Sequence, residues 1–317
     1  MERKRVAIID LGTNTFNLLI TEVKGDKYSI LLESKHPSNL GKGGIHKDTI
    51  TKEAMDRGIE ALTNHLITMS EYQVESIFCF ATSAIRSAKN GSKFVSLVKE
   101  KLGLSIRVIP GDEEAKTVFD GVKQVVPIGN DPVLIIDIGG GSIEFIIAEM
   151  RGILWKESYD IGLARLLEQF KISDPIRFSE IKILEEHFNN SLKTLIEAVR
   201  KFPIKQMIGS SGSFDTIAEI IAKEKYPMLD FRKITSFYIE LKALEEVHNL
   251  FLTLNRDGRR LIPGMDPDRV DNIVPASIMI QWALRELAID ELMQSSFALK
   301  EGAILQIIKS EFSKNTI

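Results

Sequence analysis

The sequence predicts an α/β fold made of two related lobes, and three observations lead to this prediction. The chain has 317 residues, which is more than one hydrophobic core usually serves. Its composition, with 44% apolar and 27% charged residues, is that of an ordinary globular protein. Residues 6–20 (VAIIDLGTNTFNLLI) match residues 133–147 (VLIIDIGGGSIEFII) at six of fifteen positions without a gap. The match indicates that one structural unit occurs twice.

Both copies read as a β-hairpin, in which an apolar run ends at an aspartate, a small polar turn comes next and a second apolar run begins. After the first copy, the sequence pattern predicts strand 28–34, helix 55–69, strand 75–80, helix 84–102 with a break near Asn90-Gly91, strand 105–109 and helix 113–122. From residue 132 to residue 312, the pattern predicts strands 132–137, 143–149 and 153–159, helices within 161–201, strand 205–209, helices 213–224, 240–254 and 274–287, strand 292–299 and helix 301–312. Turn residues are densest at 127–132, so we place the lobes at residues 1–127 and 128–300.

The charge balance excludes several classes of protein. Lys and Arg number 41 and Asp and Glu number 44, which gives a net charge of 41 − 44 = −3. A general nucleic-acid or membrane-surface binder would carry a basic excess, so neither partner is expected. The single cysteine, Cys79, lies in an apolar run and is expected to be a buried thiol. The sequence shows no signal-peptide core and no apolar stretch of membrane-spanning length, so we expect a cytoplasmic protein.

The two hairpin turns suggest a metal and a phosphate. Asp137 ends a buried strand, and Glu144 lies across the turn from it, so these two carboxylates could share one magnesium ion. Between them, Gly139, Gly140, Gly141 and Ser142 offer backbone N–H groups and a hydroxyl to an anion. Asp10 with Thr13 and Asn14 is the counterpart in the first copy. The alternative interpretation is a pair of tight hairpins whose aspartates are hydrogen-bonded within the protein.

Two further features are candidates for phosphate binding. Gly209, Ser210, Ser211, Gly212 and Ser213 lie between a predicted strand and a helix, where free N–H groups attract anions. Ser213 would alternatively be only the helix N-cap. Arg86 comes after a predicted strand, and its guanidinium suits bidentate phosphate binding, although a solvated surface arginine has the same sequence signature.

The helix that begins near Pro110 carries two glutamates, Glu113 and Glu114. Either is a candidate general base that activates water, and both also suit the positive end of the helix dipole. The five histidines show no metal-binding spacing, and there is no HExxH, CxxC or P-loop motif. We interpret the cluster 255–260 (NRDGRR) as a solvated loop, with contact to a long polyanion as the alternative.

At these motifs the sequence resembles the exopolyphosphatase / guanosine pentaphosphate phosphohydrolase family. The stretches that carry the resemblance occur in the family's order over nearly the whole chain: IDLGTNTFNLLI (9–20), ATSAIRSAKN (81–90), PGDEEA (110–115), IIDIGGGSIEF (135–145), GSSGS (209–213) and RVDNIVPAS (269–277). The resemblance implies two ribonuclease H-like lobes of the actin, heat-shock chaperone and sugar kinase superfamily, with a cleft between the lobes. It also implies that the C-terminal helix, residues 301–317, packs on the first lobe.

The resemblance further implies roles for single residues. Glu114 looks like the catalytic base, Asp137 and Glu144 look like the magnesium site with Asp10 facing them, and Arg86 looks like a phosphate ligand. The turns at Thr13-Asn14, Gly139–Ser142 and 209–213 look like phosphate cradles. The implied cofactor is Mg²⁺ or another divalent cation, and the implied substrates are polyphosphate and guanosine pentaphosphate.

The sequence departs from the family pattern in three places. Threonines replace the common serines at Thr13 and Thr15, Asn17 stands where many relatives carry arginine, and the C-terminal HD-type helical domain of long members is not in the sequence. A homodimer would be one way to extend the substrate path.

From these motifs and the resemblance together, we expect a hydrolase that releases terminal phosphate. A non-catalytic sensor of nucleotide or polyphosphate and an ATP-dependent phosphotransferase of the same fold are the alternatives.

Overall fold

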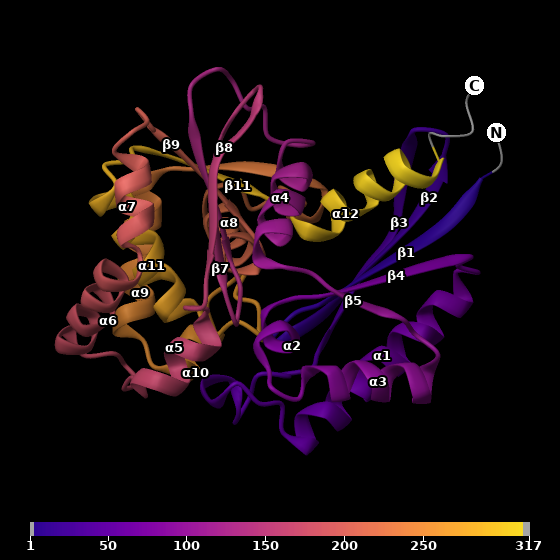
Figure 1. The fold of residues 1–317 in the computed structure, drawn as a ribbon. Helices are drawn as coiled ribbons and strands as arrows, with labels where there is room; N and C mark the ends of the chain where they lie inside the picture. Colours follow the sequence, from indigo (N-terminus) through magenta and orange to yellow (C-terminus); the bar gives the residue numbers. More distant parts are fainter. Residues whose placement is uncertain (1–2, 313–317) are drawn as a thin grey trace. The chain divides into compact units, whose positions relative to one another are not determined.

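A computed structural model describes residues 3–312 of the chain, so residues 1–2 and the predicted helical residues 313–317 lie outside the described part. The chain forms two compact units (Figure 1). Within the described residues, the first unit consists of 3–121 together with 299–312, and the second of Val122–Ala298.

The first unit is built on a five-stranded mixed sheet in the order β3-β2-β1-β4-β5. Its strands are β1 (Lys4–Leu11), β2 (Thr15–Lys24), β3 (Lys27–Pro37), β4 (Ser76–Ala81) and β5 (Ile106–Val108). The first three strands form an antiparallel meander, whereas β4 runs parallel to β1 and β5 parallel to β4. Residues 6–9, a run of Val, Ala and Ile, are fully buried because helices cover both faces of β1.

The α-helices described in the first unit are α1 (Lys52–Glu71), α2 (Ser83–Ser87), α3 (Gly91–Leu102), α4 (Gly111–Val122) and α12 (Leu299–Ile307). A short 3-10 helix (Ile45–Lys47) precedes α1, and a π-helical segment (Ile308–Phe312) follows α12. The Thr51 hydroxyl caps α1 by accepting a hydrogen bond from the Ala54 amide. Helices α1 and α3 cover one face of the sheet and α12 lies on the other (Figure 1). A Cβ at Gly302 would collide with the Thr117 carbonyl, so α12 also packs closely against α4.

The second unit repeats the same strand pattern in a six-stranded mixed sheet of order β10-β11-β9-β6-β7-β8. Its strands are β6 (Val133–Ile138), β7 (Ile143–Glu149), β8 (Gly152–Tyr159), β9 (Gln206–Ser210), β10 (Ser236–Ile239) and β11 (Glu291–Ser295). Strands β6, β7 and β8 form the antiparallel meander, and β9 and β11 continue it as parallel strands.

Seven helices of the second unit are α5 (Leu163–Phe170), α6 (Phe178–Ser191), α7 (Lys193–Val199), α8 (Gly212–Lys225), α9 (Leu241–Thr253), α10 (Arg256–Arg260) and α11 (Ile273–Glu286). Side chains from α5, α6, α8, α9 and α11 form one apolar core with a face of the sheet. The fully buried Trp282 on α11 stacks edge-on against Phe188 of α6 at the centre of this core.

The structure confirms the predicted α/β class and corrects several elements. The predicted strand 292–299 is too long, because the Ser295 hydroxyl bonds both the N–H and the carbonyl of Phe297 and ends β11 in a turn. Strand β10 and helix α10 were not predicted. Cys79 is buried as expected, and burial raises the pKa of its thiol to about 12. Among residues 3–312, no helix combines the length and apolarity needed to cross a membrane.

Candidate active site

The turns of the two hairpins have the same construction, 127 residues apart. Gly12 N–H donates to the Thr15 carbonyl at 3.1 Å, and Gly139 N–H donates to the Ser142 carbonyl at the same distance. A Cβ on Gly12 would lie 2.8 Å from that Thr15 oxygen, and one on Gly139 would lie 2.7 Å from the Ser142 oxygen. Both positions therefore require glycine, and the sequence repeat reflects a repeated local structure.

In the second unit, the carbonyl groups of the turn point into the start of α5. Leu163 N–H donates to Gly139 at 3.0 Å, Ala164 N–H donates to Gly140 at 2.8 Å, and Arg165 Nε donates to Gly141 at 3.0 Å. In the described structure, the N–H groups of Gly140 and Gly141 do not donate to any backbone carbonyl. Because the carbonyl groups of this turn are already hydrogen-bonded and two of its amide N–H groups have no backbone acceptor in the described part of the chain, the turn is suited to binding an anion through those N–H groups.

The turn of the first unit is fixed by a different segment. The Asn14 carbonyl accepts from Ser38 N–H at 2.9 Å and from Asn39 N–H at 2.8 Å, and the Thr13 carbonyl accepts from Gly41 N–H at 3.1 Å. Thr13 is buried. Thr13 and Asn14 thus lie in a rigid turn, and here too the carbonyls are held by the protein.

The predicted metal ligands Asp137 and Glu144 are direct cross-strand partners on β6 and β7. Both are buried, with 8% and 1% of their surface exposed, although two adjacent carboxylates repel each other. Glu144 Oε1 accepts hydrogen bonds of 2.7 Å from the hydroxyls of Ser142 and Ser158. Two hydroxyls thus orient Glu144, and the buried pair of carboxylates offers the oxygen ligands that a divalent cation prefers.

Asp10 occupies the equivalent position in the first unit, and its cross-strand partner is Asn17. Asn17 Nδ2 donates to Asp10 Oδ2 at 3.1 Å, so this pair has one carboxyl group where the second unit has two. Burial opposes the charged form of Lys300, but the carboxylates of Glu301, Glu33 and Asp10 outweigh it and raise the pKa of the lysine above its usual range. Lys300 therefore supplies positive charge to the face of the sheet that carries Asp10.

The described residues contain no group of three or more His, Cys, Asp or Glu side chains arranged to hold a metal. Asp137 and Glu144 come together as predicted, and a third ligand from Asp10 stays a prediction. Two protein carboxylates supplemented by substrate phosphates match the way magnesium is usually held in phosphate-processing sites.

The structure separates the two candidate bases on α4. Glu114 is 7% exposed, and its Oε2 accepts a hydrogen bond of 2.5 Å from Arg86 Nη1. The same Nη1 donates to the Ile109 carbonyl at 3.1 Å. Glu113 instead forms a surface ion pair of 2.6 Å with Arg107, whose side chain is 61% exposed. Only Glu114 is brought together with Arg86, so the geometry favours it as the functional glutamate.

The loop 209–213 joins β9 to α8 in a strained conformation. Ser211 has a φ of 72° and is the N-cap of α8, so the interpretation of Ser213 as the N-cap is wrong. The hydroxyls of Ser210 and Ser213 are fully buried and have no hydrogen-bond partner in the described structure. Buried hydroxyls without partners next to a helix N-terminus are unfavourable unless a ligand or water satisfies them.

One residue near this loop was not predicted as part of the site. A Cβ on Gly212 would lie 2.6 Å from Cζ and 2.7 Å from Nε of Arg269, so the Arg269 guanidinium occupies the space above this glycine. Arg269 is the first residue of RVDNIVPAS, one of the stretches that carry the family resemblance. The sequence of this stretch alone did not assign a role to the arginine. Arg269 adds a cation to a loop that already offers N–H groups and hydroxyls.

The chain is similar to proteins of known class over most of its length. A curated bifunctional 3-dehydroquinate synthase/phosphatase from Fusobacterium nucleatum is 30% identical over 96% of this chain, which spans about half (47%) of that relative. A guanosine-5'-triphosphate,3'-diphosphate pyrophosphatase from Photobacterium profundum is 27% identical over 97% of this chain and 61% of that relative. The crystal structure of an exopolyphosphatase from Cytophaga hutchinsonii is 35% identical, with a TM-score of 0.93, over 96% of this chain and 98% of that one.

The family model described as Ppx/GppA phosphatase matches residues 19–311. This range includes the whole sheet of the second unit, the sheet of the first unit except β1 and the start of β2, the Arg86–Glu114 pair and the Asp137–Glu144 pair. With the geometry described above, the match identifies the chain as a member of the Ppx/GppA phosphatase family.

Proposed function

We propose that this chain is a magnesium-dependent hydrolase that releases the terminal phosphate of inorganic polyphosphate, of guanosine pentaphosphate, or of both. The observation that carries the proposal is the pair of the half-buried Arg86 and the buried Glu114. A carboxylate held by a guanidinium at the start of a helix combines a proton acceptor with a phosphate-binding cation. The names of the relatives, an exopolyphosphatase and a guanosine-5'-triphosphate,3'-diphosphate pyrophosphatase, support the same reaction class.

In the proposed mechanism, Glu114 accepts a proton from the attacking water and orients it in line with the scissile P–O bond. Arg86 donates to Glu114 and Ile109 through Nη1, and its Nε–Nη2 edge is proposed to bind the transferring phosphoryl group. The water oxygen forms the new bond to phosphorus, the bridging oxygen leaves with the shortened chain, and the proton resides on the Glu114 carboxylate. Fixing the water and the phosphate in this geometry lowers the entropic part of the barrier.

The residues present fit a divalent cation, because Asp137 and Glu144 form a buried pair of oxygen ligands with donors that orient Glu144. We propose that these two carboxylates hold Mg²⁺, with Asp10 as a further ligand directly or through water. When bound, such an ion neutralises charge on the phosphate oxygens. We further propose that both units are ribonuclease H-like lobes, and that residues 1–127 and 128–300 are their approximate extents.

The proposed phosphate cradles are the amides of the Thr13-Asn14 turn, the amides of Gly139–Ser142 and the loop 209–213. The second cradle is supported by the spared amides of Gly140 and Gly141, and the third by the two buried hydroxyls that lack partners. A hydrolase of this kind needs no basic protein surface, because amides, Mg²⁺ and two arginines offset the substrate charge locally.

The test measures phosphate release from polyphosphate, guanosine pentaphosphate and ATP, with and without Mg²⁺. We expect magnesium-dependent release from the first or second substrate. Tight binding of a substrate without release would identify a sensor and refute the proposal. Transfer of the phosphate to an acceptor other than water would identify a phosphotransferase and would refute it as well.

A further inference from the structure

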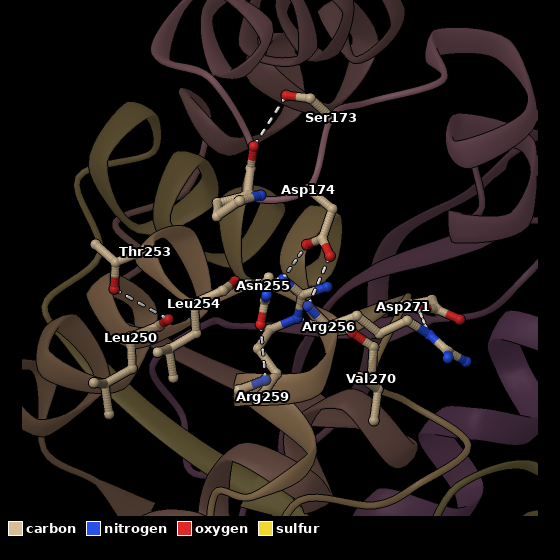
Figure 2. A network of polar contacts seen from close by, with 12 residues as sticks. Ser173, Asp174, Leu250, Thr253, Leu254, Asn255, Arg256, Arg259, Val270 and Asp271 are labelled. Carbon is tan, nitrogen blue, oxygen red and sulfur yellow. Dashed lines mark hydrogen bonds and ion pairs between the residues drawn. The ribbon is translucent and has the colours of Figure 1, made fainter.

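The cluster 255–260, interpreted from the sequence as a solvated loop, is helix α10 with a buried arginine at its centre (Figure 2). Arg259 is only 4% exposed. Its Nη1 donates to Asp174 Oδ1 and to the Leu254 carbonyl, both at 2.7 Å, and its Nε donates to the Val270 carbonyl at 3.1 Å. The loop assignment is therefore wrong, and so is the solvation of Arg259, whose buried guanidinium is compensated by three acceptors. The solvated part of the interpretation holds for the four exposed residues of the cluster, Asn255, Arg256, Asp257 and Arg260.

A second set of bonds holds the same region together. Asp174 Oδ2 accepts from the Arg256 amide at 2.7 Å, and Arg256 Nε donates to Asp271 Oδ1 at 2.6 Å (Figure 2). Partial burial opposes ionisation of Asp174, but the hydrogen bonds from Arg256 and Arg259 outweigh it and lower the pKa of the carboxyl. Asp174 therefore stays charged and joins the α5–α6 connection to α10.

These bonds converge on the residues that come directly after Arg269. Arg259 holds the carbonyl of Val270, and Arg256 holds the side chain of Asp271, so the backbone is fixed within two residues of Arg269. Arg269 in turn lies over Gly212 in the loop that carries the two hydroxyls without partners. The four elements involved, the α5–α6 connection, α10, the segment 269–271 and the loop 209–213, all belong to the second unit.

Stability alone does not account for a buried arginine. Replacing a buried ion pair with apolar groups of similar size is often neutral or stabilising, because desolvation of the charges offsets their attraction. What this network supplies is geometry, since three directional bonds fix where one segment of backbone lies. A substrate-binding arginine benefits from such fixing, because a displacement of about 1 Å is enough to weaken a phosphate contact substantially.

We propose that Arg259 and Asp174 are positioning residues that hold Arg269 over the 209–213 loop, and that this loop with Arg269 binds a phosphate group of the substrate. The inference rests on the proposed function, since it assumes that the loop receives part of a phosphoanhydride. Arg259 itself contacts no substrate and acts only through Arg269.

The test is the dissociation constant of tripolyphosphate, measured by calorimetry with magnesium in the Glu114→Gln background so that turnover does not intervene. We expect Arg259→Met and Arg269→Ala each to weaken binding by about tenfold. In the double variant the two effects should not add, because both remove the same contact. The control is Arg285→Met, which removes an ion pair of 2.7 Å with Glu185 elsewhere in the second unit and should leave binding unchanged.

The possible outcomes separate this proposal from the proposed function. Additive effects of Arg259→Met and Arg269→Ala, or unchanged binding in a folded Arg259→Met protein, would overturn the positioning role. If Arg259→Met does not fold, Asp174→Asn decides instead, because the Asp174 side chain is 42% exposed and tolerates substitution. We expect about threefold weaker binding for Asp174→Asn, and binding equal to that of the parent would overturn the proposal.

Binding of tripolyphosphate by the parent, with no hydrolysis of polyphosphate or guanosine pentaphosphate by the wild type, would refute only the proposed hydrolase activity and leave the positioning test intact. Failure of the parent to bind tripolyphosphate would overturn the positioning proposal, and failure to bind guanosine pentaphosphate as well would overturn both proposals.

Discussion

The substitution Glu114→Gln, compared with Glu113→Gln, separates the catalytic role of one glutamate from the general effect of charge at the start of α4. Both substitutions replace a carboxylate in the same helical turn by an uncharged amide of similar shape, which keeps one oxygen acceptor. Glu114 is buried against Arg86, whereas Glu113 pairs with an exposed arginine. We expect Glu114→Gln to lower kcat by about 10²- to 10⁴-fold, the usual contribution of a general base, and Glu113→Gln to change it less than about threefold.

The expected stability changes depend on the exposure of the two ion pairs. The side chains of Arg107 and Glu113 are 61% and 29% exposed, so loss of this pair costs about 0.2–1 kcal/mol. The side chains of Arg86 and Glu114 are 21% and 9% exposed. Because glutamine still accepts the hydrogen bond from Arg86, we expect Glu114→Gln to cost about 1–2 kcal/mol. Domains of this kind unfold with about 5–15 kcal/mol, so both variants should stay folded.

The assay combines phosphate release at saturating polyphosphate with urea denaturation of each variant. A folded Glu114→Gln protein with activity within tenfold of the wild type would refute the assignment of the base. Equal loss of activity in Glu113→Gln and Glu114→Gln would refute the argument from burial, because it would show that charge near the helix start is what matters.

Three further predictions concern contacts within single units. Ser158→Ala removes one of the two serine hydroxyls that donate to Glu144, so we expect calorimetry to show about 10- to 100-fold weaker Mn²⁺ binding. Unchanged affinity would argue against Asp137 and Glu144 as the metal site. Burial lowers the pKa of His65 from 6.5 to about 4, so the unfolded state binds more protons than the folded state at pH 5, and the free energy of unfolding decreases as the pH is lowered. Urea titrations should show that the wild type loses about 2 kcal/mol more than His65→Gln between pH 7 and pH 5. Equal losses in the two proteins would contradict burial of a neutral His65 as the cause. Gly302→Ala places a Cβ against the Thr117 carbonyl of α4, so we expect about 1–3 kcal/mol of destabilisation in the same titration, whereas unchanged stability would show that α12 and α4 are packed less closely.

The repeated hairpin could be predicted because it depends on local sequence. An apolar run, an aspartate and a glycine at fixed offsets specify strand, strand end and turn, and the structure pairs Asp10 with Asn17 as it pairs Asp137 with Glu144. The same offset also shows that Asn17 is the counterpart of Glu144. The departure from the family pattern at this position thus has a structural role, since the Asn17 amide holds Asp10.

The features that sequence could not supply depend on tertiary contacts. Glu113 and Glu114 have the same local signal, and only the placement of α4 decides which side chain is buried against Arg86. The segment 255–260 is rich in charge and reads as a loop, but acceptors distant in sequence compensate Arg259 and allow α10 to form. Strand β10 has only four residues and is stabilised by pairing with β11, so it carries little pattern of its own.

The most direct test of the proposed hydrolysis is the source of the oxygen in the released phosphate. The wild-type protein is incubated with polyphosphate and Mg²⁺ in ¹⁸O-labelled water, and the phosphate is analysed by mass spectrometry. Attack of water activated by Glu114 on the terminal phosphorus predicts one ¹⁸O atom in each phosphate released, with release suppressed in the Glu114→Gln variant. Release of unlabelled phosphate, or equal release by the variant, would contradict this mechanism.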